Sequence, residues 1–363
     1  MTVLIRRAGM AAAAATLALT ISACSKIDTP STGGAPAGGG SAATAGATPT
    51  IAYDGPEAAL KNAFPAPPAP SKKLTIGLSN LNLKIPALAQ MQAGVADEVT
   101  KIGGTLVAKD SQLDLNTQVN QMQELIDRKV DAIVVYPLDP NALAPQLKAA
   151  AAAGIPVVAI NTPIKAGDPL LPGYVANVLQ GFDRAAYSRA AAIAAVAPGS
   201  SYAVLGLTIP VGTLKYYSER QRYWADRFGL KFLGEQDAQT DDPTGGGQAM
   251  TAILGKYPDV TTVFTYNDPS ALGAAGAARS AGKTVRVFGS DGSDQATFDA
   301  VKAGQLFATY RVDQYSEGAQ ATVAAITAAA KGSLPFSTVV VTGKVVTADN
   351  AATVSPTGPL AGP

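Results

Sequence analysis

The sequence predicts an α/β protein of two lobes, each built around a parallel β-sheet, and three observations support this fold class. Short runs of β-branched and aromatic residues alternate with longer helical stretches, which is typical of parallel sheets with helices on their faces. About 290 residues follow a low-complexity N-terminal region, more than one hydrophobic core usually holds. Several strands end in a polar turn before a helix, where open α/β sheets bind ligands, as in the run at 260–268.

The first 23 residues have the composition of an export signal. Arg6 and Arg7 give a positive start, and the apolar run at 11–21 is too short to cross a bilayer. The Ile-Ser-Ala-Cys ending resembles the bacterial lipobox. We therefore expect residues 1–23 to be a lipoprotein signal peptide and a lipid on Cys24 to hold the protein on the extracytoplasmic face of the cell membrane. Cys24 is the single cysteine, which excludes an internal disulfide or a zinc–cysteine cluster.

Residues 24–71 are rich in Gly, Ala, Ser, Thr and Pro and poor in large apolar side chains. Such a segment buries too little surface to offset its chain entropy, so we expect a flexible tether, stiffer in the proline-rich part at 65–70. An alternative for part of it is a short helix within 53–64, packed against the folded body.

Charge and composition favour binding over catalysis. The net charge of +1 gives no strong electrostatic attraction to nucleic acid. Histidine is absent, which removes the commonest general base and metal ligand. We expect no enzyme activity, no cofactor and no metal. The nearest nucleotide-binding motif, at 276–284, misses the P-loop spacing by one residue and lies between a helix and a strand, the wrong order for a P-loop.

Strands are expected where β-branched runs are short, and helices where apolar residues recur at helical spacing. Gly154 marks a helix end. The expected strands are 74–79, 105–109, 131–136, 155–160, 174–176, 202–207, 230–234, 260–265, 285–289, 306–311 and 338–341. The expected helices are 87–101, 115–129, 141–153, 181–196, 214–228, 244–256, 270–281, 295–303 and 316–331.

Five segments between 72 and 345 carry a family resemblance by their order and spacing. They read KKLTIGLS, DAIVVYPLDPNAL, AAAGIPVVAIN, KYPDVTTVFTYNDPSALGAAGAARSAGK and VRVFGSDGSDQATFDAVKAGQLFATYRVDQYSEGA. In these the chain resembles the periplasmic sugar-binding proteins of ABC importers, of the ribose-binding-protein type (type I fold). The resemblance implies two Rossmann-like lobes joined by a three-strand hinge, a small sugar or polyol held in the cleft, and delivery to ABC permease subunits. It places 72–178 and 314–337 in the N-terminal lobe, and 179–313 and 338–355 in the C-terminal lobe of a monomer.

Sugar recognition needs short polar side chains and an apolar or aromatic wall. The resemblance assigns hydroxyl contacts to Asn267 and Asp291, and a guanidinium contact to Arg220. Each has a plainer alternative, namely a turn-forming Asn, an Asp-Gly turn or a solvated helix charge. Trp224, one turn beyond Arg220, either walls the cleft or packs in the core.

The remaining candidates depart from the family pattern. Asn161-Thr162 replaces Asp-Arg, which points to different ligand end chemistry such as an open-chain polyol, and the first loop lacks the stacking aromatics. Gln314 matches a hinge-edge Gln, with Asp313 as the alternative. The other expected contacts are Asn80, Asn82, Lys84 (or a surface charge) and Asp241 (or a helix cap).

Two further functions share the fold. A sensor could bind a nucleoside or signalling molecule in the same cleft. A transcription regulator would need an N-terminal helix-turn-helix, whose place the signal and tether occupy.

Overall fold

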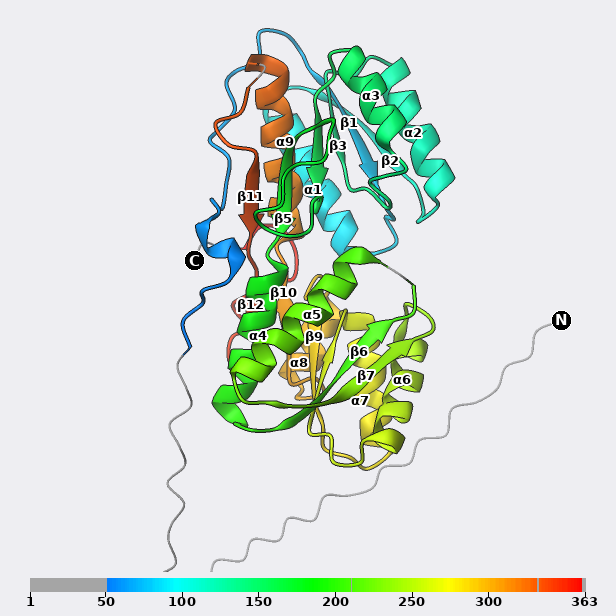
Figure 1. The fold of residues 1–363 in the computed structure, drawn as a ribbon, viewed down its shortest axis with the longest axis vertical. Coiled ribbons are helices and arrows are strands. Elements are labelled where there is room, and N and C mark those ends of the chain that lie inside the picture. Colours follow the sequence, from blue (N-terminus) through cyan, green and yellow to red (C-terminus); the bar gives the residue numbers. More distant parts are fainter. Residues whose placement is uncertain (1–50, 210, 332, 361–363) are drawn as a thin grey trace, which may run out of the picture. The chain divides into compact units, whose positions relative to one another are not determined.

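A computed structural model describes residues 51–209, 211–331 and 333–360, and in these ranges the strands form two six-stranded sheets (Figure 1). All strand pairs are parallel except β10 with β12, which confirms the predicted fold class. In sheet order, the first holds β11 (Thr338–Val341), β5 (Tyr174–Gln180), β4 (Val157–Ile160), β3 (Ala132–Val135), β1 (Thr75–Asn80) and β2 (Thr105–Asp110). The second holds β12 (Lys344–Val346), β10 (Ala308–Arg311), β9 (Arg286–Asp291), β8 (Thr262–Thr265), β6 (Ser201–Leu207) and β7 (Lys231–Ala238).

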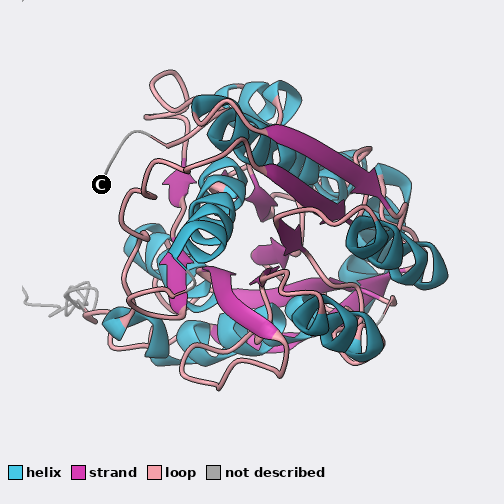
Figure 2. Cartoon of the chain, turned by 90° about the horizontal axis from the view of Figure 1, so that it is seen from above, coloured by secondary structure: helices cyan, strands magenta, loops and turns pink. Residues whose placement is uncertain are grey.

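Helices cover both faces of each sheet, so each lobe has two hydrophobic layers (Figure 2). The central strands are buried at every position, as expected for sheets covered on both faces, and read AIVV in β3, VVAI in β4 and TVFT in β8. In the first lobe, α1 (Pro86–Lys101) and α9 (Gln314–Lys331) cover one face, and α2 (Leu115–Asp127) and α3 (Ala144–Ala152) the other. In the second, α6 (Pro243–Lys256), α7 (Asp268–Ser280) and α8 (Gln295–Lys302) lie opposite α4 (Phe182–Val196) and α5 (Gly212–Arg227).

The chain crosses between the sheets three times, after β5, after β10 and after β11. The last crossing corrects the expected lobe boundary, because β11 pairs with β5 in the first sheet instead of joining the second lobe. The chain then turns at Gly343 into β12, a strand that was not expected. A β-carbon on Gly343 would lie 2.1 Å from the carbonyl oxygen of Arg311, so the second and third crossings run too close for any side chain there.

The described part of the predicted tether is packed onto the body. A 3₁₀ helix, η1 (Pro56–Ala59), lies within the stretch where a short helix was the alternative. The side chains of Glu57 and Phe64 are only 3% and 5% exposed. The expectation of a flexible tether is therefore wrong for these residues, because buried side chains fix them. The predicted signal peptide and Cys24 lie outside the described residues. Across the described ranges, no helix is both long and apolar enough to span a membrane.

Candidate functional site

A cavity of about 120 Å³ lies between the two lobes, at the carboxyl ends of their strands. Residues 84–87, which span the end of the loop after β1 and the first residues of α1, line it from the first lobe. The second lobe contributes mostly short polar side chains from the ends of β8 and β9 and the loop after β7. These are Asp241, Asn267, Asp268, Asp291, Ser293 and Asp294, together with Pro269. Lys84, Asp241, Asn267 and Asp291 were predicted from the sequence, and the fold brings these four together.

Asn267 and Asp241 form one hydrogen-bonded unit at the cavity. The Asn267 side-chain nitrogen donates to Asp241 Oδ1 at 2.5 Å, and the Tyr266 hydroxyl donates to the same oxygen at 2.8 Å. Asn267 also caps α7, since its Oδ1 accepts from the Ser270 amide at 2.9 Å. The cap of α6 is Asp242, so the helix-cap alternative for Asp241 does not hold. One oxygen of Asp241 is left for a ligand.

Asp291 ends β9 in a backbone conformation that is rare for a side-chain-bearing residue, with φ of +99°. Such backbone strain clusters at functional sites. Burial of its carboxyl, with the negative charges of Asp241 and Asp294, raises the pKa of Asp291 to about 7, against the opposing charge of Arg189. The carboxyl is therefore close to half-protonated at neutral pH and can either donate or accept a hydrogen bond.

The Asp268 carboxylate anchors the turn that follows Asp291, a role that its position in the sequence did not indicate. The carboxylate accepts hydrogen bonds from the Gly292 amide and, at 2.7 Å, from the Thr309 hydroxyl. Burial, and then the neighbouring charge of Asp291, raise the pKa of Asp268 well above its usual value. The residue that caps α7 is Asn267, and Asp268 is the first residue of the helix. Ser293 and Asp294 were also missed, because each sits in a turn typical of helix starts.

The first-loop candidates divide into one cavity residue and two structural ones. Lys84 is exposed and lines the cavity. Asn80 is fully buried, donating to the Leu88 carbonyl at 3.0 Å and accepting from the Leu81 amide at 2.8 Å. Asn82 accepts from the Lys84 amide at 3.0 Å and so shapes the turn. Asn80 and Asn82 thus position the loop that carries Lys84.

Asn161 and Gln314 lie buried near the hinge instead of lining the cavity. Asn161 donates to Glu317 Oε1 at 2.8 Å and accepts from the Gln180 amide at 2.7 Å. Gln314 begins α9, and its Oε1 has no hydrogen-bond partner among the described residues. The alternative at this position, Asp313, accepts from the amides of Ser316 and Leu360.

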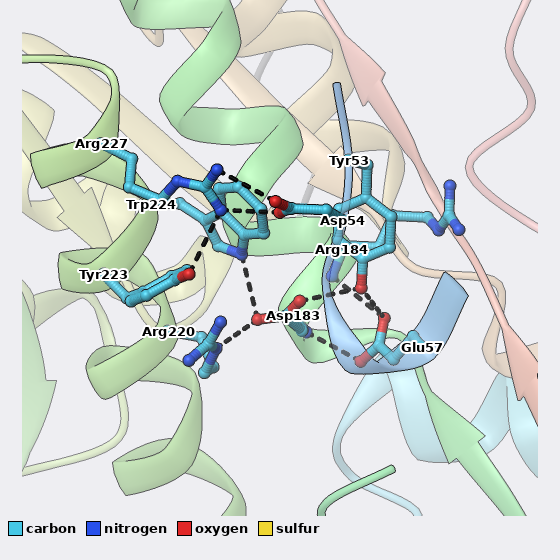
Figure 3. A network of polar contacts seen from close by, with 9 residues as sticks. All are labelled: Tyr53, Asp54, Glu57, Asp183, Arg184, Arg220, Tyr223, Trp224 and Arg227. Atoms are coloured by element: carbon cyan, nitrogen blue, oxygen red, sulfur yellow. Dashed lines mark hydrogen bonds and ion pairs between the residues drawn. The ribbon is translucent and has the colours of Figure 1, made fainter. Parts of the chain in front are cut away.

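The side chains of Arg220 and Trp224 point toward Asp183 at the start of α4 (Figure 3). The Arg220 guanidinium forms an ion pair with Asp183, which is fully buried, and the Trp224 indole donates to the same carboxylate at 3.0 Å. Trp224 is 0% exposed, so it is a core residue and cannot wall the cleft. In this structure the Arg220 guanidinium is paired with Asp183, and Arg220 does not line the cavity.

A second cavity, of about 430 Å³, lies within the second lobe between α5 and the sheet. None of the ten predicted ligand contacts lines it. Both amide atoms of Gln221 on its wall lack a hydrogen-bond partner among the described residues. We take the smaller cavity as the candidate site, because closure of two lobes can enclose only a ligand that lies between them. Among the described residues, no group of three or more acidic side chains has metal-binding geometry.

Comparison with known proteins agrees with this architecture. The family model described as periplasmic binding protein domain matches residues 76–333, most of the chain. The chain belongs to the periplasmic binding protein family. Among periplasmic binding proteins, the ribose import binding protein of Bacillus subtilis is 31% identical over 261 residues, covering 70% of this chain and 81% of the relative.

Two other relatives are named for different ligands. The xylitol-binding protein of Mycolicibacterium smegmatis is 28% identical over 208 residues, covering 56% of this chain and 58% of its own. A solved solute binding protein of an ABC transporter from Bacillus halodurans, with bound myo-inositol, superposes with a TM-score of 0.68 at 25% identity and covers 78% of this chain and 97% of its own. Periplasmic binding proteins similar to this chain thus hold a sugar, an open-chain polyol and a cyclic polyol.

Proposed function

We propose that this protein captures a small carbohydrate or polyol between its lobes and delivers it, chemically unchanged, to an ABC importer. The observation that carries the proposal is the cavity lined by both lobes, with Asp241, Asn267 and Asp291 at strand ends. These groups provide the mixed donors and acceptors that vicinal hydroxyls need, within about 120 Å³. The ligands for which the relatives are named support the same class.

The cavity wall also bears on which ligand within this class is bound. Its first-lobe side is Lys84, Ile85, Pro86 and Ala87, which offers no aromatic face for a pyranose ring to stack on. Recognition therefore rests on hydrogen bonds from the second lobe. We propose an open-chain polyol or a small furanose ahead of a pyranose.

We further propose that the protein acts as a monomer outside the cytoplasmic membrane, held by a lipid on Cys24. The support is the sequence pattern at residues 1–24. Globomycin treatment of a producing cell, followed by mass spectrometry, tests this, since a lipoprotein precursor accumulates when its signal peptidase is inhibited. Release of the unmodified protein into the medium would contradict it.

A thermal-melt screen of the protein against pentoses, hexoses, tetritols, pentitols and nucleosides tests the ligand class. A ligand at 1,000 times its dissociation constant adds about 4 kcal/mol of stability. For lobes of this size we expect the melting temperature to rise by roughly 8–16 °C with a sugar or polyol. A shift with nucleosides alone would favour the sensor function, and no shift in a well-folded sample would reject carbohydrate capture.

A further inference from the structure

Residues 51–64 contact both lobes, and we refer to them as the strap. The three crossings of the main chain lie after β5, β10 and β11, and the strap precedes all of them in sequence. Sequence composition marked this stretch as part of a tether. Its contacts show what it holds and how firmly.

One half of the strap, residues 51–57, docks on α4 and α5 of the second lobe (Figure 3). The Tyr53 hydroxyl donates to Asp183 at 2.8 Å, and its ring lies 5.6 Å from that of Trp224. The Arg227 guanidinium donates two hydrogen bonds to the Asp54 carboxylate, at 2.6 and 3.1 Å. Polar and aromatic contacts together fix this half.

Glu57 makes the contact that is hardest to replace. The residue before α4 is Gly181, which has no side chain to cap the helix, so the first amides of α4 need an acceptor from elsewhere. Glu57 supplies it, accepting from the Asp183 amide at 2.9 Å and the Arg184 amide at 3.0 Å. A β-carbon on Gly181 would lie 3.2 Å from Glu57 and 3.3 Å from the carbonyl of Val341. Glu57 therefore sits at the first and third crossings.

The other half of the strap, residues 61–64, docks on the first lobe. The Lys61 carbonyl accepts from the Val340 amide of β11 at 2.9 Å. The Phe64 amide donates to Gln320 on α9 at 2.7 Å, and the Phe64 ring stacks on Phe336 with centroids 5.3 Å apart. From Glu57 to Lys61 the chain can span at most about 14 Å, so the strap has little slack between its two attachments.

We propose that residues 51–64 are a fourth connection across the hinge, which limits how far the lobes separate. Glu57 is its latch, because it joins the strap to α4 beside two crossings. The proposal concerns the lobes and holds whatever the ligand is.

The single Trp allows a direct test, because Trp224 lies beneath Tyr53. In the full chain without ligand, Glu57→Ala should release the second-lobe half of the strap. We expect acrylamide quenching of Trp224 fluorescence to rise at least twofold and the radius of gyration from small-angle X-ray scattering to increase. Asn62→Ala, an exposed strap residue without a side-chain hydrogen bond, is the matched control and should change neither.

Two results with a folded variant would overturn the proposal. A folded Glu57→Ala protein with wild-type quenching would show that Glu57 does not latch the strap. Increased quenching with an unchanged radius of gyration would show that the strap does not restrain the lobes. If Glu57→Ala does not fold, amide hydrogen exchange of the wild-type protein tests whether the strap contacts are formed. The amides of Asp183, Arg184 and Val340 should be protected, and fast exchange at all three would reject the strap.

Discussion

Asn161 donates a 2.8 Å hydrogen bond to the carboxyl of Glu317, joining the end of β4 to α9 just beyond the second crossing. Glu317 is 1% exposed, and no Lys or Arg in the described ranges pairs with it. Burial, together with the charges of Asp313 and Asp291, raises the pKa of Glu317 to about 8, although the Asn161 hydrogen bond opposes the shift. The contact thus places a mostly protonated carboxylic acid at the hinge at neutral pH.

The first prediction is that stability falls as pH rises from about 4.5 to 8. The folded protein holds the Glu317 proton more tightly than the unfolded chain does, so its stabilising contribution is complete below the unfolded pKa and is lost as pH rises through the folded one. The slope from one such group approaches about 1.4 kcal/mol per pH unit. Glu317→Gln should reduce the slope of the unfolding free energy against pH, measured by urea denaturation at pH 5, 6, 7 and 8. Glu219→Gln, which removes an exposed carboxylate, is the control and should keep most of this slope. Equal slopes in wild type and Glu317→Gln would contradict the prediction.

The second prediction separates ligand binding from helix capping at Asn267. Serine caps helices as well as asparagine does, but it lacks the amide group. Asn267→Ser should therefore keep the stability of α7 and lose hydrogen bonds to the ligand, weakening binding by roughly 10- to 100-fold, since an unpaired buried polar group costs about 1–3 kcal/mol. Calorimetry with the ligand found in the melt screen gives the affinity.

A cap remote from the cavity provides the control for this prediction. Asp114 caps α2 by accepting from the Thr117 amide at 2.6 Å, so Asp114→Ser should change neither affinity nor fold. Wild-type affinity in Asn267→Ser would remove Asn267 from the site.

The third prediction concerns the role of Arg220. If it pairs with Asp183, as the structure has it, Arg220→Ala leaves a buried carboxylate with less compensation and should lower the free energy of unfolding by about 2–4 kcal/mol. Arg222, two residues on, lies over the Phe232 ring and serves as the matched variant, with a smaller expected loss. A stable Arg220→Ala protein with greatly weakened ligand binding would instead support a contact in the cleft.

The fourth prediction uses two glycines of α7. A β-carbon on Gly273 would lie 1.8 Å from the Pro243 carbonyl oxygen of α6, whereas one on Gly276 would approach nothing closer than 4.0 Å. Gly273→Ala should force the two helices apart and cost about 1–3 kcal/mol. Gly276→Ala should be neutral or stabilising by up to about 1 kcal/mol, because alanine favours the helix. Melting temperatures of the pair test this, and equal shifts would contradict it.

The sequence reveals the cavity residues at strand ends because parallel topology itself brings such ends together. Asp241 and Asn267 follow β7 and β8, and Asp291 ends β9 of the same sheet, so the parallel topology explains why these residues, assigned from the family resemblance, lie together. Positions on helices are harder, since a motif does not fix the rotation of a helix about its axis. Arg220 and Trp224 turn toward Asp183, which lies on another helix and gives no local signal.

The strap and the third crossing could not be predicted for a similar reason. Glu57 and Asp183 are 126 residues apart, and a buried glutamate within a Pro- and Ala-rich stretch looks like linker. The placement of β11 depends on which of two sheet edges it joins, and its Thr-Val-Val-Val sequence would suit either edge.

The position of β11 also matters while the protein is being made. Strands β1 to β5 are complete once Gln180 has been synthesised, but their partner at the open edge begins only at Thr338. At typical synthesis rates the gap lasts roughly 10–30 s. During that time β5 presents unpaired backbone groups, which can pair with other chains. A nascent chain of this protein therefore carries an aggregation-prone edge until almost its last residues emerge, and a message truncated before β11 would leave that edge open permanently.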